Sequence, residues 1–197
     1  LTGLGHKLIE VDFSELSSGI CSYYVIAPAE CSSNLSRFDG VKYGYRSEGE
    51  KDIANLYMNT RSDGFGDEVK KRILIGTHVL SAGFYDAYYL QAQKVRRMIK
   101  VKFEDFFKDV DLIFMPTTLD QAFEKNRKSD DPNRMYKEDL LTIPANLAGL
   151  PAISFPNGFK NNLPIGGQLI GKYFGEDLLL NTTNKIQEVT DWHKMTP

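Results

Sequence analysis

The chain has 197 residues, a formal net charge of −2 and a hydrophobic content of 42%. These values describe a globular chain of one or two domains, long enough to bury a core without disulfides or metals. The 12% aromatic content excludes a disordered chain, and no apolar run approaches the roughly 20 residues of a transmembrane helix. The balance of 24 basic and 26 acidic residues argues against a protein devoted to binding nucleic-acid phosphates.

The two cysteines and the three histidines show no metal-binding spacing. Cys21 and Cys31 form neither a ligand pair nor a disulfide framework, which is typical of inert thiols in a reducing compartment. His6, His78 and His193 are scattered along the chain, so their spacing predicts no metal cluster.

The sequence begins with the pattern of a helix end. Apolar side chains and two glycines occupy residues 1–5, and the run 7–11 that follows has the composition of a strand. A helix end requires a helix before it, and residue 1 is Leu rather than Met. We therefore expect the sequence to begin inside a larger protein.

The rest of the chain alternates between helical and strand-like patterns. Residues 21–29 are aromatic and β-branched, and the polar, glycine-punctuated residues 30–46 predict an ordered loop. Five segments are predicted as helices: 52–61, 67–80, 85–110, 136–148 and 176–189. Three short apolar runs are predicted as strands: 111–115, 152–155 and 165–171. The charged residues 117–135, after the first of these strands, are predicted as a loop.

Helices that alternate with short apolar strands predict the α/β class with a largely buried sheet. No segment has the composition of a domain linker. We therefore expect residues 1–197 to form one unit without an internal boundary, and this unit to be incomplete.

The serines offer no recognisable nucleophile. Ser32 and Ser33 lie in the predicted loop and Ser154 in a predicted strand, and the sequence has no Gly-x-Ser-x-Gly elbow. A serine needs an adjacent base or lysine to attack a substrate. We interpret these three residues as turn, capping or strand residues.

The helix predicted at 67–80 places an arginine beside its apolar stripe. Lys70 and Lys71 point away from this stripe, whereas Arg72 lies in one row with Gly76 and Val79. Such an arginine either lays its stem along apolar surface and keeps its charge in water, or is held as a fixed fork for a carboxylate. The helical pattern leaves both interpretations open.

Asp139 lies at the start of the helix predicted at 136–148. It is either a first-turn acid favoured by the helix dipole or a carboxylate positioned for an ammonium group. A glutamine-like substrate presents a carboxylate and an ammonium group, and the pair Arg72 and Asp139 would bind one each.

Six stretches of the sequence carry a family resemblance when taken in order: Ser-Ser-Asn-Leu-Ser-Arg-Phe-Asp-Gly at the start of 32–44, Gly-Phe-Gly-Asp-Glu-Val at the start of 64–73, 81–89, Gln-Lys-Val-Arg at 93–96, Asn-Leu-Ala-Gly-Leu-Pro at 146–151 and Pro-Ile-Gly-Gly-Gln at 164–168. They closely resemble the C-terminal half of the amidase-signature family. More narrowly, they resemble the glutaminase subunits of the amidotransferases that act on glutamyl-tRNA(Gln) and aspartyl-tRNA(Asn). The resemblance covers nearly the whole chain and is weakest at 119–134 and after 180.

The resemblance implies that residues 1–197 are the C-terminal part of a single amidase domain, with a mixed β-sheet covered by helices on both faces. It also implies a parent enzyme that hydrolyses glutamine and releases ammonia. A partner subunit then uses ATP and Mg²⁺ to convert the glutamate on tRNA(Gln), or the aspartate on tRNA(Asn), to the amide.

The catalytic machinery that the resemblance implies is absent from this sequence. The family uses a Ser-cis-Ser-Lys triad within a Gly/Ser-rich signature, and no such run occurs here. The triad is therefore expected before Leu1 or missing altogether, so the chain contributes no catalytic residue. We expect the chain to be inactive by itself, because substrate-positioning residues cannot replace a nucleophile.

The resemblance implies a role in substrate binding for three residues. Arg72 would hold the carboxylate of glutamine, Asp139 its amino group, and Tyr23 would form part of the pocket wall. One departure is visible, because Gly167 stands where the family usually has leucine before the glutamine.

The same resemblance implies partners and a location. The partners are glutamine, the other amidotransferase subunits and, through the complex, tRNA, with no membrane and no cofactor or metal in this chain itself. The expected location is the cytoplasm, or an organelle of bacterial descent. Two alternatives stay open: a fragment of another amidase-signature carboxamide hydrolase, or a non-catalytic binding or assembly module.

Overall fold

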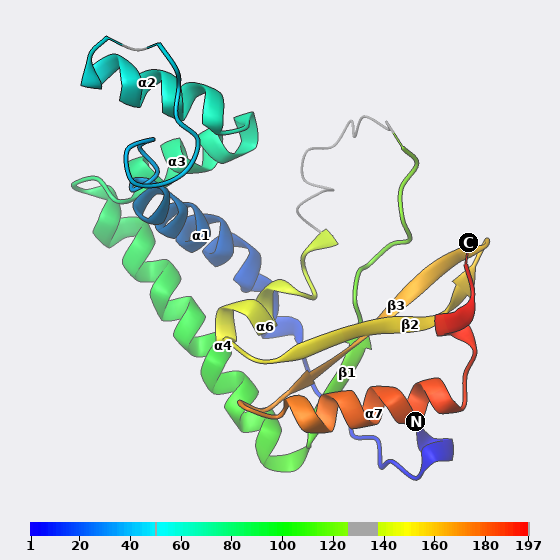
Figure 1. The fold of residues 1–197 in the computed structure, drawn as a ribbon. Helices are drawn as coiled ribbons and strands as arrows, with labels where there is room; N and C mark the ends of the chain where they lie inside the picture. The colour runs from blue at the N-terminus through cyan, green and yellow to red at the C-terminus, as the bar shows by residue number, and fades with distance from the viewer. Residues whose placement is uncertain (50, 126–137, 197) are drawn as a thin grey trace. The chain divides into compact units, whose positions relative to one another are not determined.

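The structure is a computed structural model that describes residues 1–49, 51–125 and 138–196 (Figure 1). Its residues separate into two compact units, one formed by Leu1–Ile20 with Val95–Pro197 and the other by Cys21–Lys94. The expectation of one amidase domain without an internal boundary stays a prediction.

The first unit is built around a three-stranded sheet. Its strands are β1 (Leu112–Pro116), β2 (Ala152–Lys160) and β3 (Leu163–Gly171), in the order β1-β3-β2. Both pairings are antiparallel, with Phe114 and Ile153 on either side of Leu169. The α/β class is confirmed, but the sheet of the described residues is antiparallel where the expectation was a mixed one.

The helical elements that accompany this sheet are η1 (Thr2–Leu4), η2 (Ser14–Ser18), α4 (Leu90–Asp109) from Val95 onward, α6 (Ile143–Ala148), α7 (Glu176–Glu188) and η4 (Trp192–Lys194). The predicted helices 85–110 and 176–189 correspond to α4, with the turn before it, and to α7. The predicted helix 136–148 is represented by α6 alone, and most of the loop predicted at 117–135 lies outside the described residues.

The central strand β3 is buried on both faces. Because side chains alternate along a strand, Leu169 faces α7, and Gln168 and Ile170 face the opposite side. Leu169 packs in one apolar cluster with Phe155, Leu179 and Ile186, and α7 lies along this face of the sheet (Figure 1). Ile170 is 0% exposed and Gln168 is 3% exposed, so the opposite face is covered as well.

A tight hairpin joins β2 to β3. Asn161 and Asn162 both have a positive φ, 53° and 60°, as a two-residue type I′ turn requires. Asparagine tolerates this left-handed conformation better than most residues. The turn explains why β2 and β3 extend beyond the predicted strands 152–155 and 165–171.

The strand predicted at 7–11 is wrong. These residues are irregular, and two of the apolar side chains, Leu8 and Ile9, are 61% and 46% exposed. A strand is stabilised by a partner along its ladder. No strand of the described residues pairs with this segment.

The second unit is helical and contains α1 (Gly19–Leu35) from Cys21 onward, α2 (Ile53–Gly64), α3 (Asp67–Val79) and the π-helical turn η3 (Tyr85–Tyr89). The helices predicted at 52–61 and 67–80 are confirmed. The aromatic, β-branched residues 21–29 belong to α1, although Pro28 lies inside this helix. Packing of the helix therefore outweighs the strand preference of its side chains.

An ordered loop connects α1 to α2, as predicted, although it starts later than residue 30 because α1 continues to Leu35. Nη1 of Arg61 donates to the carbonyl oxygens of Leu35 at 2.8 Å and Phe38 at 3.1 Å. The backbone N–H of Ser47 donates to Oγ1 of Thr60 at 3.0 Å. The loop is thus fastened to α2 near its beginning and its end.

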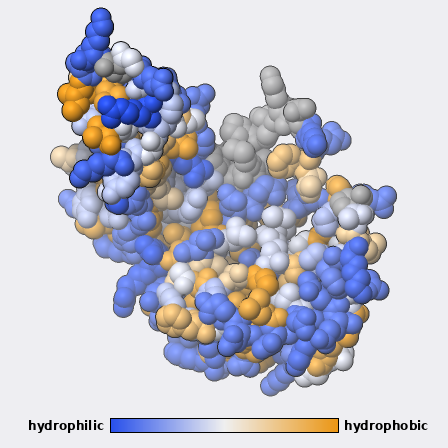
Figure 2. Space-filling model, in the orientation of Figure 1, coloured by the Kyte–Doolittle hydropathy of each residue, from blue (hydrophilic) through white to orange (hydrophobic). Residues whose placement is uncertain are grey.

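The face of the molecule drawn in Figure 2 is largely hydrophilic, with apolar side chains in small groups. The large apolar side chains exposed in the second unit include Ile53, Met58 and Leu74. Scattered apolar side chains are ordinary at protein surfaces and do not indicate a binding site by themselves. Within the described residues, no helix combines the length and apolar character needed to cross a bilayer.

Helices α1 and α3 approach each other closely at Gly76. A side chain at this position would clash with the carbonyl oxygen of Pro28 and would lie 2.8 Å from Cβ of Ser32. One turn of α1 further on, Oγ of Ser32 lies 2.8 Å from Oγ1 of Thr77. Because the Thr77 hydroxyl donates to the carbonyl oxygen of Ile73, Ser32 is the donor to Thr77.

We predict that Gly76→Ala destabilises the protein because the new methyl group forces α1 and α3 apart. Overpacking of this kind costs about 1–3 kcal/mol. The free energy of unfolding, measured with urea, should fall by that amount. Gly3→Ala is the control, because nothing lies within 4 Å of a side chain there, and its effect should stay within about 0.5 kcal/mol. A Gly76→Ala protein as stable as the control would show that the helices separate without cost.

Candidate functional site

Arg72 lies on the packed side of α3, where the helical pattern places it. Its row-mates Gly76 and Val79 are buried, and 35% of the Arg72 side chain is exposed. Nε donates to Oε1 of Glu68 at 3.0 Å. This hydrogen bond, and a second one to Tyr23, raise the pKa of the Arg72 guanidinium above its ordinary value. The guanidinium is therefore a permanent positive charge whose position is set by two partners.

Tyr23 reaches Arg72 from α1. Its ring is half-buried and meets the ring of Tyr24 edge-on, with 5.1 Å between the centroids. The structure thus brings together two of the three residues that the sequence singles out. Helices α1 and α3 therefore touch at two successive levels: Tyr23 bonds Arg72, and one turn further along α3 the backbone of Pro28 approaches Gly76.

Glu68 is a member of this cluster that we did not predict. It lies four residues before Arg72, a spacing that places both side chains on one face of a helix. That spacing is the signal that could have identified it. Because Glu68 occupies Nε of Arg72, the terminal nitrogens of the guanidinium donate to Tyr23 and to any further acceptor.

Asp139 belongs to the first unit and is an exposed residue of the turn before α6. Its carbonyl oxygen accepts hydrogen bonds from the backbone N–H groups of Thr142 at 3.2 Å and Ile143 at 3.0 Å. Thr142 is the N-cap of α6. Asp139 is therefore not a first-turn acid of the helix that ends at Ala148, which removes the helix-dipole explanation for this helix.

A buried amide supports the turn that carries Asp139. Nε2 of Gln168 donates to the carbonyl oxygen of Leu141 at 2.8 Å and lies 3.5 Å from that of Pro116. Its side chain was not among the predicted site residues. The available signal was a polar residue in the middle of the apolar run 165–171.

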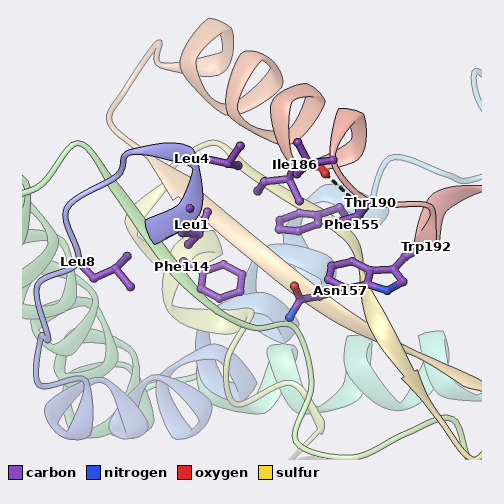
Figure 3. Close-up of a pocket in the computed structure, with 11 residues that line it drawn as sticks. Leu1, Leu4, Leu8, Phe114, Phe155, Asn157, Ile186, Thr190 and Trp192 are labelled. Atoms are coloured by element: carbon purple, nitrogen blue, oxygen red, sulfur yellow. Dashed lines mark hydrogen bonds between the residues drawn. The ribbon is translucent and has the colours of Figure 1, made fainter.

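A separate groove of about 520 Å³ lies on the α7 side of the sheet (Figure 3). Its walls are mainly apolar and include Leu1, Leu4, Phe114, Phe155 and Trp192. The three predicted site residues do not line it. This groove is therefore distinct from the residues expected to bind substrate.

The packing beside this groove accounts for Gly167. A side chain at Gly167 would lie 2.9 Å from Cε2 of Phe114, 3.1 Å from Cβ of Asn157 and 3.3 Å from Cζ of Phe155. The rings of Phe114 and Phe155 stack with their centroids 6.1 Å apart. These two rings fill the space that a leucine at this position would need.

The described residues contain no group of three or more His, Cys, Asp or Glu side chains able to hold a metal ion. The guanidinium, phenol and carboxylate groups of Arg72, Tyr23 and Asp139 can recognise charged and polar groups through hydrogen bonds.

Comparison with known proteins identifies relatives along almost the whole chain. The family model described as Amidase matches residues 1–180. The A-type subunit of the glutamyl-tRNA(Gln) amidotransferase of Hahella chejuensis (strain KCTC 2396) is 58% identical over 194 residues, 98% of this chain and 40% of that protein. The chain spans about two fifths of the length of the curated relatives it matches.

Solved structures show the same fold. The crystal structure of the corresponding glutamyl-tRNA(Gln) amidotransferase subunit from Thermotoga maritima is 42% identical, with a TM-score of 0.58, and the match covers 86% of this chain and 32% of that one. The structure of 6-aminohexanoate cyclic dimer hydrolase has a TM-score of 0.66 at 18% identity, covering 100% of this chain and 40% of that one. The likeness to the hydrolase concerns the fold alone.

Proposed function

Because the chain belongs to the amidase family, we propose that it is the substrate-recognising, C-terminal part of the glutaminase subunit of a tRNA-dependent amidotransferase. The observation that carries this proposal is the arginine of α3, held by Glu68 and Tyr23, in a chain whose relatives bear the amidotransferase name. The parent enzyme hydrolyses glutamine and supplies ammonia for the conversion of Glu-tRNA(Gln), or Asp-tRNA(Asn), to the amide.

Arg72 binds the α-carboxylate of glutamine in this proposal. Its charge is permanent, and Glu68 fixes Nε so that the terminal nitrogens present a planar pair of donors. Tyr23 restrains the guanidinium from α1 and forms part of the pocket wall. A guanidinium held in place loses little side-chain entropy when it binds a carboxylate, which favours binding.

Asp139 binds the α-ammonium group of glutamine. It lies in a turn whose backbone is hydrogen-bonded to the first residues of α6, so the backbone that carries the carboxylate is held in place. A carboxylate in this role would favour amino acids over carboxamides that lack an ammonium group.

The nucleophile, the bridging serine and the lysine of the family triad belong to the remainder of the parent protein in this proposal. The chain alone is then inactive, because it orients glutamine without supplying the covalent step. A partner subunit uses ATP and Mg²⁺ and binds the tRNA, which this chain meets only through the complex. The assembled enzyme works in the cytoplasm, or in an organelle of bacterial descent.

We predict that Arg72→Ala lowers kcat/KM for glutamine in the full-length, assembled enzyme. Loss of a hydrogen bond to a charged group costs about 1.5–3 kcal/mol, or roughly ten- to hundredfold in kcat/KM. Lys71→Ala is the matched control, because Lys71 is the exposed neighbour on the same helix. Its kcat/KM, measured as ammonia release, should stay within about twofold of the wild type. Equal losses in the two variants would refute the assignment of Arg72.

We predict that Asp139→Asn weakens the use of glutamine more than that of its des-amino analogue, 4-carbamoylbutanoate. The analogue has no ammonium group, so removal of the carboxylate charge should leave its kcat/KM within about twofold and lower that of glutamine roughly tenfold or more. Glu138→Gln is the control, because it removes the adjacent carboxylate. A parallel loss on both substrates would count against the role of Asp139.

Two outcomes would redirect the proposal as a whole. Hydrolysis of another carboxamide in place of glutamine by the full-length enzyme would identify a different amidase. Failure to hydrolyse any carboxamide, with all subunits present, would identify a binding or assembly module.

A further inference from the structure

Gln168 is a polar residue whose side chain is almost wholly buried. The residue lies in the central strand β3 and is 3% exposed. A buried amide is unfavourable unless its polar atoms are hydrogen-bonded. Nε2 of Gln168 meets this requirement by donating to the carbonyl oxygen of Leu141 at 2.8 Å. The sheet is thereby hydrogen-bonded to a segment 27 residues earlier in the chain.

Leu141 lies in the same turn as Asp139. The carbonyl oxygen of Asp139 accepts from the backbone N–H groups of Thr142 and Ile143, and Nδ2 of Asn146 donates to the carbonyl oxygen of Thr142 at 2.9 Å. These bonds shape the turn and join it to α6. The bond from Gln168 is of another kind, because it fixes the turn to the sheet.

We infer that Gln168 is a positioning residue that holds the Asp139 turn against the sheet and so sets how strongly the enzyme recognises the ammonium group of its substrate. This inference rests on the proposed function, in which Asp139 binds that group. The side chain does not touch the substrate. Its effect reaches the substrate through the backbone of Leu141 and the carboxylate of Asp139.

The inference makes the amide hydrogen, rather than the bulk of the side chain, the important feature. Methionine has a similar length and fills irregular spaces, but it donates no hydrogen bond. Gln168→Met therefore leaves the packing of β3 nearly unchanged and removes the donor to the carbonyl oxygen of Leu141, together with the longer bond, 3.5 Å, to that of Pro116 in β1. Ser154→Ala is a matched control, because Ser154 pairs directly with Gln168 across the sheet and its hydroxyl bonds Thr117 instead of the turn.

The test compares glutamine with 4-carbamoylbutanoate in the full-length, assembled enzyme. Gln168→Met should lower kcat/KM for glutamine about tenfold, mainly through KM, and change that of the analogue less than about twofold. In an Asp139→Asn background the same substitution should have no further selective effect, because the two residues act through one contact. Ser154→Ala should leave the ratio between the substrates unchanged.

Equal losses on both substrates, or no loss on either, would overturn the inference and leave Gln168 a residue of the sheet alone. If Gln168→Met does not assemble, Gln168→Glu decides the matter. A protonated carboxyl group donates one hydrogen bond and a carboxylate donates none. Discrimination between the substrates should therefore fall as the pH rises through the pKa of the introduced group, and a constant ratio would contradict the inference.

Failure of the inference can be told apart from failure of the proposed function. If Asp139→Asn itself shows no selective effect, the proposed role of Asp139 is wrong. If Asp139→Asn is selective and Gln168→Met is not, the proposed function stands and the positioning role of Gln168 falls.

Discussion

The first unit depends on a strand that has to be buried on both faces. β3 lies between β1 and β2, so its alternate side chains need partners on opposite sides of the sheet. Leu169 meets the apolar face of α7. On the other side, Ile170 is enclosed and Gln168 finds its acceptor in the backbone of the turn that carries Asp139. Helix α7 on one face and the Asp139 turn on the other thus both contact the same strand, β3.

The second unit depends on a close approach between helices. At Gly76 of α3, a side chain would clash with the carbonyl oxygen of Pro28 in α1. The glycine therefore permits the close approach of the two helices. Arg72 lies one turn before Gly76 and meets Tyr23 on the facing helix. The hydrogen bond between these side chains joins the same two helices. A substitution at Gly76, which itself contacts no ligand in the proposal, would therefore be expected to shift Arg72 relative to Tyr23.

The helices and the Arg72 position were predictable because they follow from local periodicity. The segments 52–61 and 67–80 and the strand 111–115 are found as expected, and the row of Arg72 is the packed one. The strand at 7–11 and the helix over 21–29 were not predictable, because their states depend on the presence or absence of neighbours far along the chain. Gln168 was missed for the same reason. Its function depends on a carbonyl group that only the fold brings near, whereas Glu68 was available from its four-residue spacing. The roles of Arg72, Tyr23 and Asp139 in binding a substrate stay predictions.

The turn at Asn161 and Asn162 has a consequence for the order in which the sheet is assembled. Closing a two-residue loop costs little chain entropy, whereas pairing β1 with β3 must enclose the whole segment 117–162. The hairpin of β2 and β3 is therefore the local part of the sheet, and we expect the pairing of β1 with β3 to form later. The left-handed backbone of Asn161 and Asn162 thus makes one of the two strand pairings local in the sequence and leaves the other distant.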